Sequence, residues 1–150
     1  MKSLSCRFGV AEERLQLEEL QRRASLVYDA YRDALLANPD AIHLPLSQLE
    51  EKQVRVAEED GLVLGFTAVL PREGGVCDLD GLFVEPDRWR RGIGRALMQD
   101  AFVQARNGGM AVMEVLGNPH AEGFYVKLGF VRTGTVMLPF GMGLKMHRRL

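Results

Sequence analysis

The feature that most constrains the fold is a change of hydrophobic period in the middle of the chain, from strand to helix and back. Val76–Val84 has the pattern of a strand, and Met110–Leu116 is a short apolar run with the pattern of a second one. Between them, apolar residues recur at four-residue steps from Ile93 to Ala105, which predicts one amphipathic helix. A strand, a helix and a strand in succession predict a parallel strand pair joined by a right-handed crossover.

Segments on either side of this unit add helices and antiparallel strands. Apolar residues at three- and four-residue steps predict helix over Glu12–Asn38, in one piece or two, and Pro39 ends the pattern. Residues 41–51 are left open as a connection, with a short helix over 47–50 as one option. Two runs around the turn Glu59–Gly61 predict a β-hairpin. The other predicted elements are hairpin strands over 53–56 and 62–70, a small helix through 124–128, and closing strands over 131–138 and 144–148.

These elements define the fold class as α+β, with a mixed, mostly antiparallel sheet and helices on both of its faces. A chain of 150 residues is long enough to bury its own core, so we predict a single domain over residues 1–150. Lys and Arg number 19 against 20 Asp and Glu, a net charge of -1. This balance argues against a nucleic acid or a membrane surface as the partner.

The cysteines carry little functional information. Cys6 and Cys77 are too few and too far apart for a disulfide framework or a metal-ligand pattern, so no metal is predicted and both are interpreted as buried free thiols. The first residues lack the apolar core of a signal peptide, and no run approaches the roughly 20 apolar residues that span a bilayer. We therefore expect a cytoplasmic protein.

The stretch Arg88–Arg95 carries the strongest functional signal. It precedes the central helix without a Ser, Thr, Asp or Asn, the residues that usually cap the first N–H groups of a helix. Its four arginines lie at the positive end of the helix dipole, where each cation is unfavourable by about 0.3–1 kcal/mol. Gly92 and Gly94 let another group approach the backbone closely. A bound anion would satisfy the N–H groups, the dipole and the arginines together, which predicts a phosphate site.

Two common nucleotide motifs do not fit this stretch. A P-loop requires Gly-Lys-Ser or Gly-Lys-Thr, whereas Gly94 is followed by Arg95 and Ala96. A dinucleotide fingerprint requires a third glycine near the position of Leu97, and a parallel sheet. The alternative without a ligand is a solvated basic helix start whose glycines only shape the turn.

Two segments of the sequence resemble motifs of the GCN5-related N-acetyltransferase (GNAT) superfamily. Leu82–Pro86 followed by Arg90–Leu97 is similar to its coenzyme A motif, Gln/Arg-x-x-Gly-x-Gly/Ala, with Trp89 at the Gln/Arg position. Downstream, Asn118–Phe130 is similar to the family's Asn-x-x-Ala-x-x-Phe-Tyr-x-x-x-Gly-Phe segment. The two motifs stand in the expected order on the expected elements.

The resemblance implies acetyl-CoA as the cofactor and a splayed gap between the two central strands, which holds the pantetheine arm. It also implies that an N–H of the first strand polarises the thioester carbonyl. The residues expected to bind the cofactor are Leu82, Phe83 and Val84 on that strand, Trp89, Arg90, Arg91, Gly92, Ile93, Gly94 and Arg95 at the turn, and Asn118, Phe124 and Tyr125 downstream.

Acetyl transfer to an amine requires a neutral nucleophile and a proton for the leaving thiolate. Tyr125 matches the family's thiol-facing tyrosine and is the expected general acid; a half-buried tyrosine with its hydroxyl in water is the alternative. Asp78 and Asp80 share one face of their strand and are the candidate bases, with Asp80 slightly favoured. The alternative is that they are solvated or pair with an arginine. Glu85 faces the other way and is interpreted as a solvated strand end.

The acceptor amine is not determined by the sequence. A polyamine, an aminoglycoside, a peptide or an amino acid all remain open, and the oligomeric state is open too, with a homodimer as one option. Phe140–Gly143 resembles the loop that lines the acceptor pocket in the family, although its apolar side chains could equally be core. A non-catalytic acyl-CoA sensor is the main alternative function. An RNA-binding basic patch over Arg88–Arg95 is a weaker one.

Overall fold

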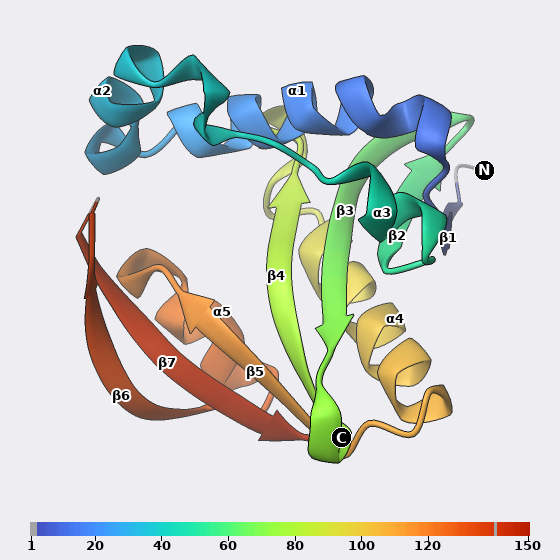
Figure 1. Cartoon of the computed structure of the whole chain (residues 1–150). Coiled ribbons are helices and arrows are strands. Elements are labelled where there is room, and N and C mark those ends of the chain that lie inside the picture. Colours follow the sequence, from blue (N-terminus) through green and yellow to red (C-terminus); the bar gives the residue numbers. More distant parts are fainter. Residues whose placement is uncertain (1–2, 140) are drawn as a thin grey trace. The chain divides into compact units, whose positions relative to one another are not determined.

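A computed structural model describes residues 3–139 and 141–150, with the side chains of all of these except 29–31. Their strands form one sheet in the order β1-β2-β3-β4-β5-β7-β6 (Figure 1). The strands are β1 (Leu4–Phe8), β2 (Val54–Glu59), β3 (Leu62–Pro71), β4 (Val76–Val84), β5 (Val112–Gly117), β6 (Val131–Leu138) and β7 (Gly141–Arg149). The helices are α1 (Arg14–Leu26), α2 (Asp29–Ala37), α3 (Leu46–Glu50), α4 (Ile93–Asn107) and α5 (Glu122–Lys127).

The chain divides into two compact units. The first consists of Met1–Ala68 and Gly81–Asp100, and the second of Val69–Asp80 and Ala101–Leu150. Strands β3 and β4 and helix α4 therefore contribute residues to both units. The single domain expected over residues 1–150 stays a prediction.

The first unit buries apolar side chains on both faces of its strands. Because successive strand residues point to opposite faces, the neighbours Val56 and Ala57 belong to different clusters. One cluster packs α1 on the sheet through Leu17, Leu20, Leu44, Leu49, Val54, Val56, Val63, Phe66 and Ala68. The other packs the start of α4 through Ala57, Leu64, Ile93 and Leu97. The predicted arrangement of helices on both faces is confirmed here.

The second unit is built on the predicted parallel pair. Strand β4 pairs with β5 in parallel from Val76 to Leu79, and β5 and β6 each pair with β7 in antiparallel fashion. Phe102 of α4 packs against Phe130 at 6.0 Å between ring centroids. The Arg148 guanidinium lies 4.0 Å from the Phe102 centroid and donates to the Leu128 carbonyl at 2.7 Å. The crossover is confirmed, while the splayed gap concerns the relation between the two units and stays a prediction.

The structure decides two points that the sequence left open and differs from some predicted boundaries. The N-terminal helical segment is in two pieces, α1 and α2, and the optional short helix is present as α3. Strand β7 begins at Gly141, three residues before the predicted start, because Gly141, Met142 and Gly143 all pair with β6. No strand was predicted at Leu4–Phe8, which is β1 and pairs with β2. Its partner lies about 50 residues away, so only tertiary pairing fixes it.

The two cysteines differ in burial. Cys77 is fully buried, as expected, and burial together with the neighbouring Asp78 charge raises the pKa of its thiol to about 11. Cys6 is only partly buried, and burial again raises its thiol pKa. Both thiols are free, and raised pKa values keep them protonated and unreactive near neutral pH.

Gly65 of β3 permits the close packing of β4 and α4, and its replacement tests this packing. A Cβ atom there would lie 2.8 Å from the Phe83 carbonyl oxygen and 2.9 Å from Leu97 Cδ1. We expect Gly65→Ala to lower the free energy of unfolding by about 1–3 kcal/mol, measured by urea denaturation. Gly123→Ala is the matched control, because a Cβ at Gly123 meets no atom within 4 Å. Equal stability of the two variants would contradict the packing described.

Candidate cofactor and catalytic site

The connection from β4 to α4 is held firmly at its start. Glu85 donates its N–H to the Leu64 carbonyl at 2.9 Å, and its carboxylate accepts two hydrogen bonds from Arg23 of α1 at 2.9 and 2.7 Å. The expectation of a solvated Glu85 is therefore wrong, because a tertiary partner on α1 occupies the carboxylate. Pro86–Arg88 then forms a short 3₁₀ turn, labelled η4.

The next residues form a turn with an unusual backbone. Arg90 has φ 66° and Gly92 has φ 80°, both in the left-handed region that a non-glycine residue adopts only at some cost. The first hydrogen bond of α4 runs from the Ala96 N–H to the Gly92 carbonyl at 3.0 Å. The N–H groups of Ile93, Gly94 and Arg95 consequently have no acceptor within the helix. The start of α4 thus presents a cluster of donors, as the sequence predicts.

Positive charge surrounds this turn. Arg90, Arg91 and Arg95 are exposed, and none of the three has an ion-pair partner among the side chains that the structure describes. Arg88 has a 3.8 Å contact with its neighbour Asp87. Uncompensated cations at the positive end of a helix favour an anion at that place. Backbone donors, a glycine and exposed guanidinium groups fit the phosphates of coenzyme A.

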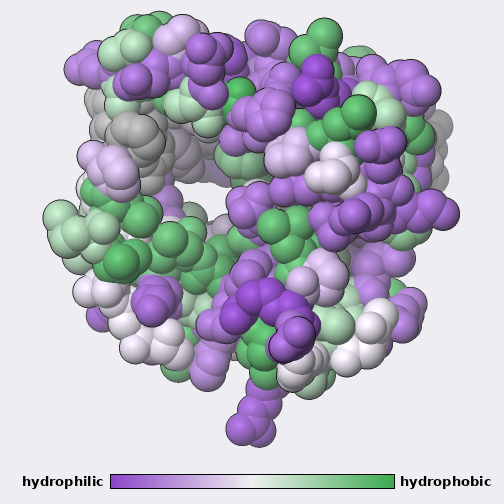
Figure 2. Space-filling view, viewed as in Figure 1, coloured by the Kyte–Doolittle hydropathy of each residue, from purple (hydrophilic) through white to green (hydrophobic). Residues whose placement is uncertain are grey.

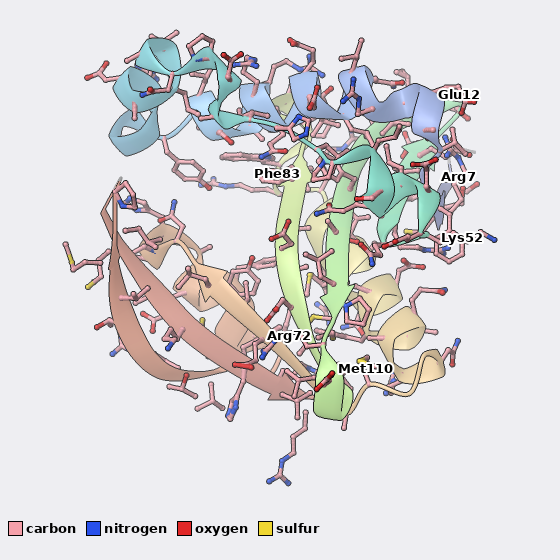
Figure 3. All side chains as sticks on the ribbon, in the orientation of Figure 1. Arg7, Glu12, Lys52, Arg72, Phe83 and Met110 are labelled. Atoms are coloured by element: carbon pink, nitrogen blue, oxygen red, sulfur yellow. The ribbon has the colours of Figure 1, made fainter. Side chains whose placement is uncertain are left out.

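The end of β4 lies next to this turn in the first unit. Leu82 and Val84 pack against the α4 cluster, while Phe83 points to the opposite face and meets Phe66 at 5.4 Å between ring centroids (Figure 3). The Trp89 indole N–H donates to the Val84 carbonyl at 2.8 Å. All predicted cofactor residues from Leu82 to Arg95 are therefore brought together in one unit.

The remaining predicted residues lie in the second unit. Tyr125 is buried, with 7% of its surface exposed, so the alternative of a half-exposed tyrosine is wrong. Its ring meets Phe124 and Phe130 edge to face, each at 5.3 Å, and lies against Gly117 of β5. The tertiary structure thus fixes the orientation of the Tyr125 ring.

Asn118 caps the turn before α5, because its side-chain oxygen accepts a hydrogen bond from the His120 N–H at 2.9 Å.

The two candidate bases have different surroundings. Asp78 forms an ion pair with Arg72 at 2.8 Å, as in the alternative considered above, whereas Asp80 is exposed. Arg72 also pairs with Glu114, the residue beside Asp78 in the parallel ladder (Figure 3). The hydrogen bond from Arg72 to Glu114 is the largest cause that raises the pKa of Arg72, and its hydrogen bond to Asp78 is the next largest. Sequence reasoning missed Arg72 and Glu114, although a glutamate alternating within an apolar strand was a usable signal.

The loop expected to line the acceptor pocket is described only in part. Phe140 lies outside the described residues, while Gly141–Gly143 begin β7. A Cβ atom on Gly143 would lie 2.9 Å from Leu138 and 3.0 Å from Leu116, so these side chains close over the glycine. Figure 2 shows hydrophobic surface over the β6–β7 hairpin, to which exposed Val131, Met137, Leu138 and Met142 contribute.

In the described part of the chain, no group of three or more His, Cys, Asp or Glu side chains could hold a metal ion. Among the helices so described, none is both long and apolar enough to span a bilayer.

The mixed α+β sheet and the uncapped, arginine-rich start of α4 agree with the class predicted from the sequence, the acyl-CoA-dependent acyltransferases. Residues 50–132 match the model of the acetyltransferase (GNAT) domain, and the chain belongs to this family. Acetyl-CoA is the family's cosubstrate. The family, its class of reaction and its cosubstrate are those predicted from the sequence.

Individual relatives agree with this assignment. The peptidyl-lysine N-acetyltransferase YiaC of Escherichia coli (strain K12) is 39% identical over 99 residues, which are 66% of this chain and 55% of that protein. The chain thus matches about half the length of this curated relative. The PaiA N-acetyltransferase of Thermoplasma acidophilum, solved in complex with coenzyme A, has a TM-score of 0.81 at 18% identity, covering 99% of both chains.

A second solved structure has a similar fold but belongs to a larger protein. N-acetylglutamate synthase of Neisseria gonorrhoeae, complexed with coenzyme A and N-acetyl-glutamate, has a TM-score of 0.74 at 19% identity. The likeness covers 99% of this chain and 35% of that one. At such identities the likeness establishes the fold alone.

Proposed function

We propose that this chain transfers the acetyl group of acetyl-CoA to an amine by direct attack. The observation that carries the proposal is the turn before α4, where Arg90 and Gly92 adopt left-handed conformations and leave the first helix N–H groups open. In a GNAT acetyltransferase domain, this turn is the expected place for the cofactor phosphates.

The chemistry requires one bond to form and one to break. The amine nitrogen attacks the thioester carbonyl carbon, and collapse of the tetrahedral adduct expels the thiolate. Acetyl-CoA, when bound, supplies the activated acyl group. We assign Tyr125 as the general acid: its hydroxyl donates a proton to the leaving thiolate. The buried ring of Tyr125 holds this hydroxyl in one orientation. An N–H of Leu82–Val84 is the proposed donor to the developing oxyanion.

Asp80 is our preferred base for the attacking amine. Asp78 already shares Arg72 with Glu114, so it would have to give up an ion pair to act on the amine. Asp80 lies on the same face of β4 and is exposed, so an incoming amine could reach its carboxylate. It would accept the proton directly or through water.

A lysine side chain of a peptide or protein is the acceptor that we favour. The support is the relative named as a peptidyl-lysine N-acetyltransferase, which is 39% identical over 99 residues. A small-molecule amine is the alternative acceptor. The proposal also includes action in the cytoplasm and one domain over residues 1–150, with either a monomer or a homodimer.

An assay of thiol release tests the proposed function. We expect release of free coenzyme A when the protein, acetyl-CoA and a lysine-containing peptide with a blocked N-terminus are combined. The control peptide carries acetyl-lysine at the same position and should release nothing above background. Calorimetry should detect binding of coenzyme A and acetyl-CoA but not of ATP. Binding without turnover on peptides or small amines would favour the acyl-CoA sensor, and no binding would refute both functions.

A further inference from the structure

Trp89, the only tryptophan in the chain, lies directly before the phosphate turn. We propose that it is a positioning residue, which fastens the turn Arg90–Gly92 to the end of β4 and thereby aligns the helix N–H groups for the cofactor phosphates. The inference rests on the proposed function, since it assigns a role within the same site. It replaces the expectation that Trp89 itself contacts the cofactor.

Two contacts hold the indole ring within the first unit. Its Nε1–H donates to the Val84 carbonyl at 2.8 Å, so the donor is used inside the chain. Its ring lies 5.8 Å from the Tyr28 ring, centroid to centroid, with the planes tilted by 33°. The ring is thus tied both to the last residue of β4 and to the junction between α1 and α2.

The turn needs such a restraint because the residues after Trp89 lack one of their own. Arg90, Arg91 and Gly92 are all exposed, and Arg90 holds a left-handed conformation that is costly for a residue with a Cβ. A strained conformation persists only where its surroundings determine it. The firm contacts of Glu85 lie four residues upstream of Trp89, and buried Ile93 holds the far end of the turn. The indole is therefore the side-chain restraint next to the strained Arg90.

A turn that is already in its binding conformation loses less entropy when a ligand binds. Removal of the restraint should therefore weaken cofactor binding while the rest of the fold persists. The effect should fall on the affinity and on the KM for acetyl-CoA, and it should leave kcat close to the wild-type value.

Two substitutions separate the hydrogen bond from the ring. Trp89→Phe keeps a ring beside Tyr28 but removes the donor, and we expect the Kd for coenzyme A to rise about 3- to 10-fold. Trp89→Gln restores a donor, because its amide nitrogen lies the same number of bonds from Cα as the indole nitrogen. The increase in log Kd for Trp89→Gln should therefore be at most half of the increase for Trp89→Phe.

The control addresses simple destabilisation. Val56 is fully buried in the cluster beneath α1, on the face of the sheet opposite the start of α4. Val56→Ala should lower the thermal midpoint more than Trp89→Phe does, yet leave the Kd for coenzyme A unchanged. Calorimetry supplies the Kd, and the KM and kcat come from thiol release.

The outcomes separate the inference from the function on which it rests. Wild-type protein that fails to bind coenzyme A refutes the proposed function. Wild-type binding with an unchanged Kd in Trp89→Phe overturns the positioning role and leaves the function intact. An equal rise of Kd in Val56→Ala also overturns it, because loss of stability would then explain both variants.

Discussion

Replacement of Gly94 by aspartate is expected to weaken coenzyme A binding by at least about 100-fold, or about 2.7 kcal/mol. Gly94 is the second residue of α4, where its N–H has no acceptor within the helix. A carboxylate there would face the cofactor phosphates with like charge, and two unit charges 4 Å apart near a protein surface repel by about 4 kcal/mol. Calorimetric titration with coenzyme A measures the loss.

The same substitution should not damage the fold, which makes its result easy to interpret. An acidic side chain in the first turn of a helix is favourable by about 0.3–1 kcal/mol, and loss of a glycine stiffens the unfolded chain. We therefore expect a thermal midpoint at or above that of the wild type. Gly94→Asn is the control, since it adds nearly the same volume without charge and should retain more affinity. An unchanged Kd for coenzyme A in Gly94→Asp would show that the cofactor phosphates do not bind at this turn.

Removal of one oxygen from Tyr125 is expected to lower turnover about 100-fold with little change in acetyl-CoA affinity. General acid catalysis contributes typically 10²–10⁴-fold, and Tyr125→Phe removes the proton donor assigned to the leaving thiolate. The phenyl ring keeps the edge-to-face contacts with Phe124 and Phe130, so α5 should stay in place. Steady-state kinetics with a lysine peptide, together with calorimetry, give the two quantities separately.

A matched variant distinguishes catalysis from packing. Phe130→Leu disturbs the same aromatic cluster without touching a proton donor, and Phe130 is 2% exposed. It should lower the thermal midpoint and reduce turnover much less than Tyr125→Phe. Wild-type turnover in Tyr125→Phe would exclude the hydroxyl from the mechanism, and the leaving thiolate would then take its proton from another group.

The elements that sequence predicts correctly are those fixed by local pattern. The amphipathic period of α4, the strand pattern of β4 and the short apolar run of β5 each lie within a dozen or so residues. The turn Arg90–Gly94 belongs to the same group, because uncapped N–H groups, glycines and arginines at a helix start are all read from adjacent residues. The resemblance to the GNAT family rests on two such local motifs, and the family match confirms it.

The elements that sequence did not predict depend on partners far along the chain. Strand β1 becomes a strand through pairing with β2, and Glu85 finds Arg23 across 62 residues. Arg72 meets Glu114 across 42 residues, which draws Asp78 into an ion pair. No local pattern encodes these pairings, since they follow from the order of strands in the sheet and from the packing of α1 on it.

The sequence by itself therefore determined the α+β class, the central crossover and the place of the uncapped turn before α4, because helix period, strand period and helix capping act between near neighbours. Only the tertiary structure decided that Asp78 is held by Arg72, that the Tyr125 ring is buried, and that Trp89 is tied to Val84. Each of these depends on which surfaces the folded chain brings into contact, and that is a property of packing between distant segments.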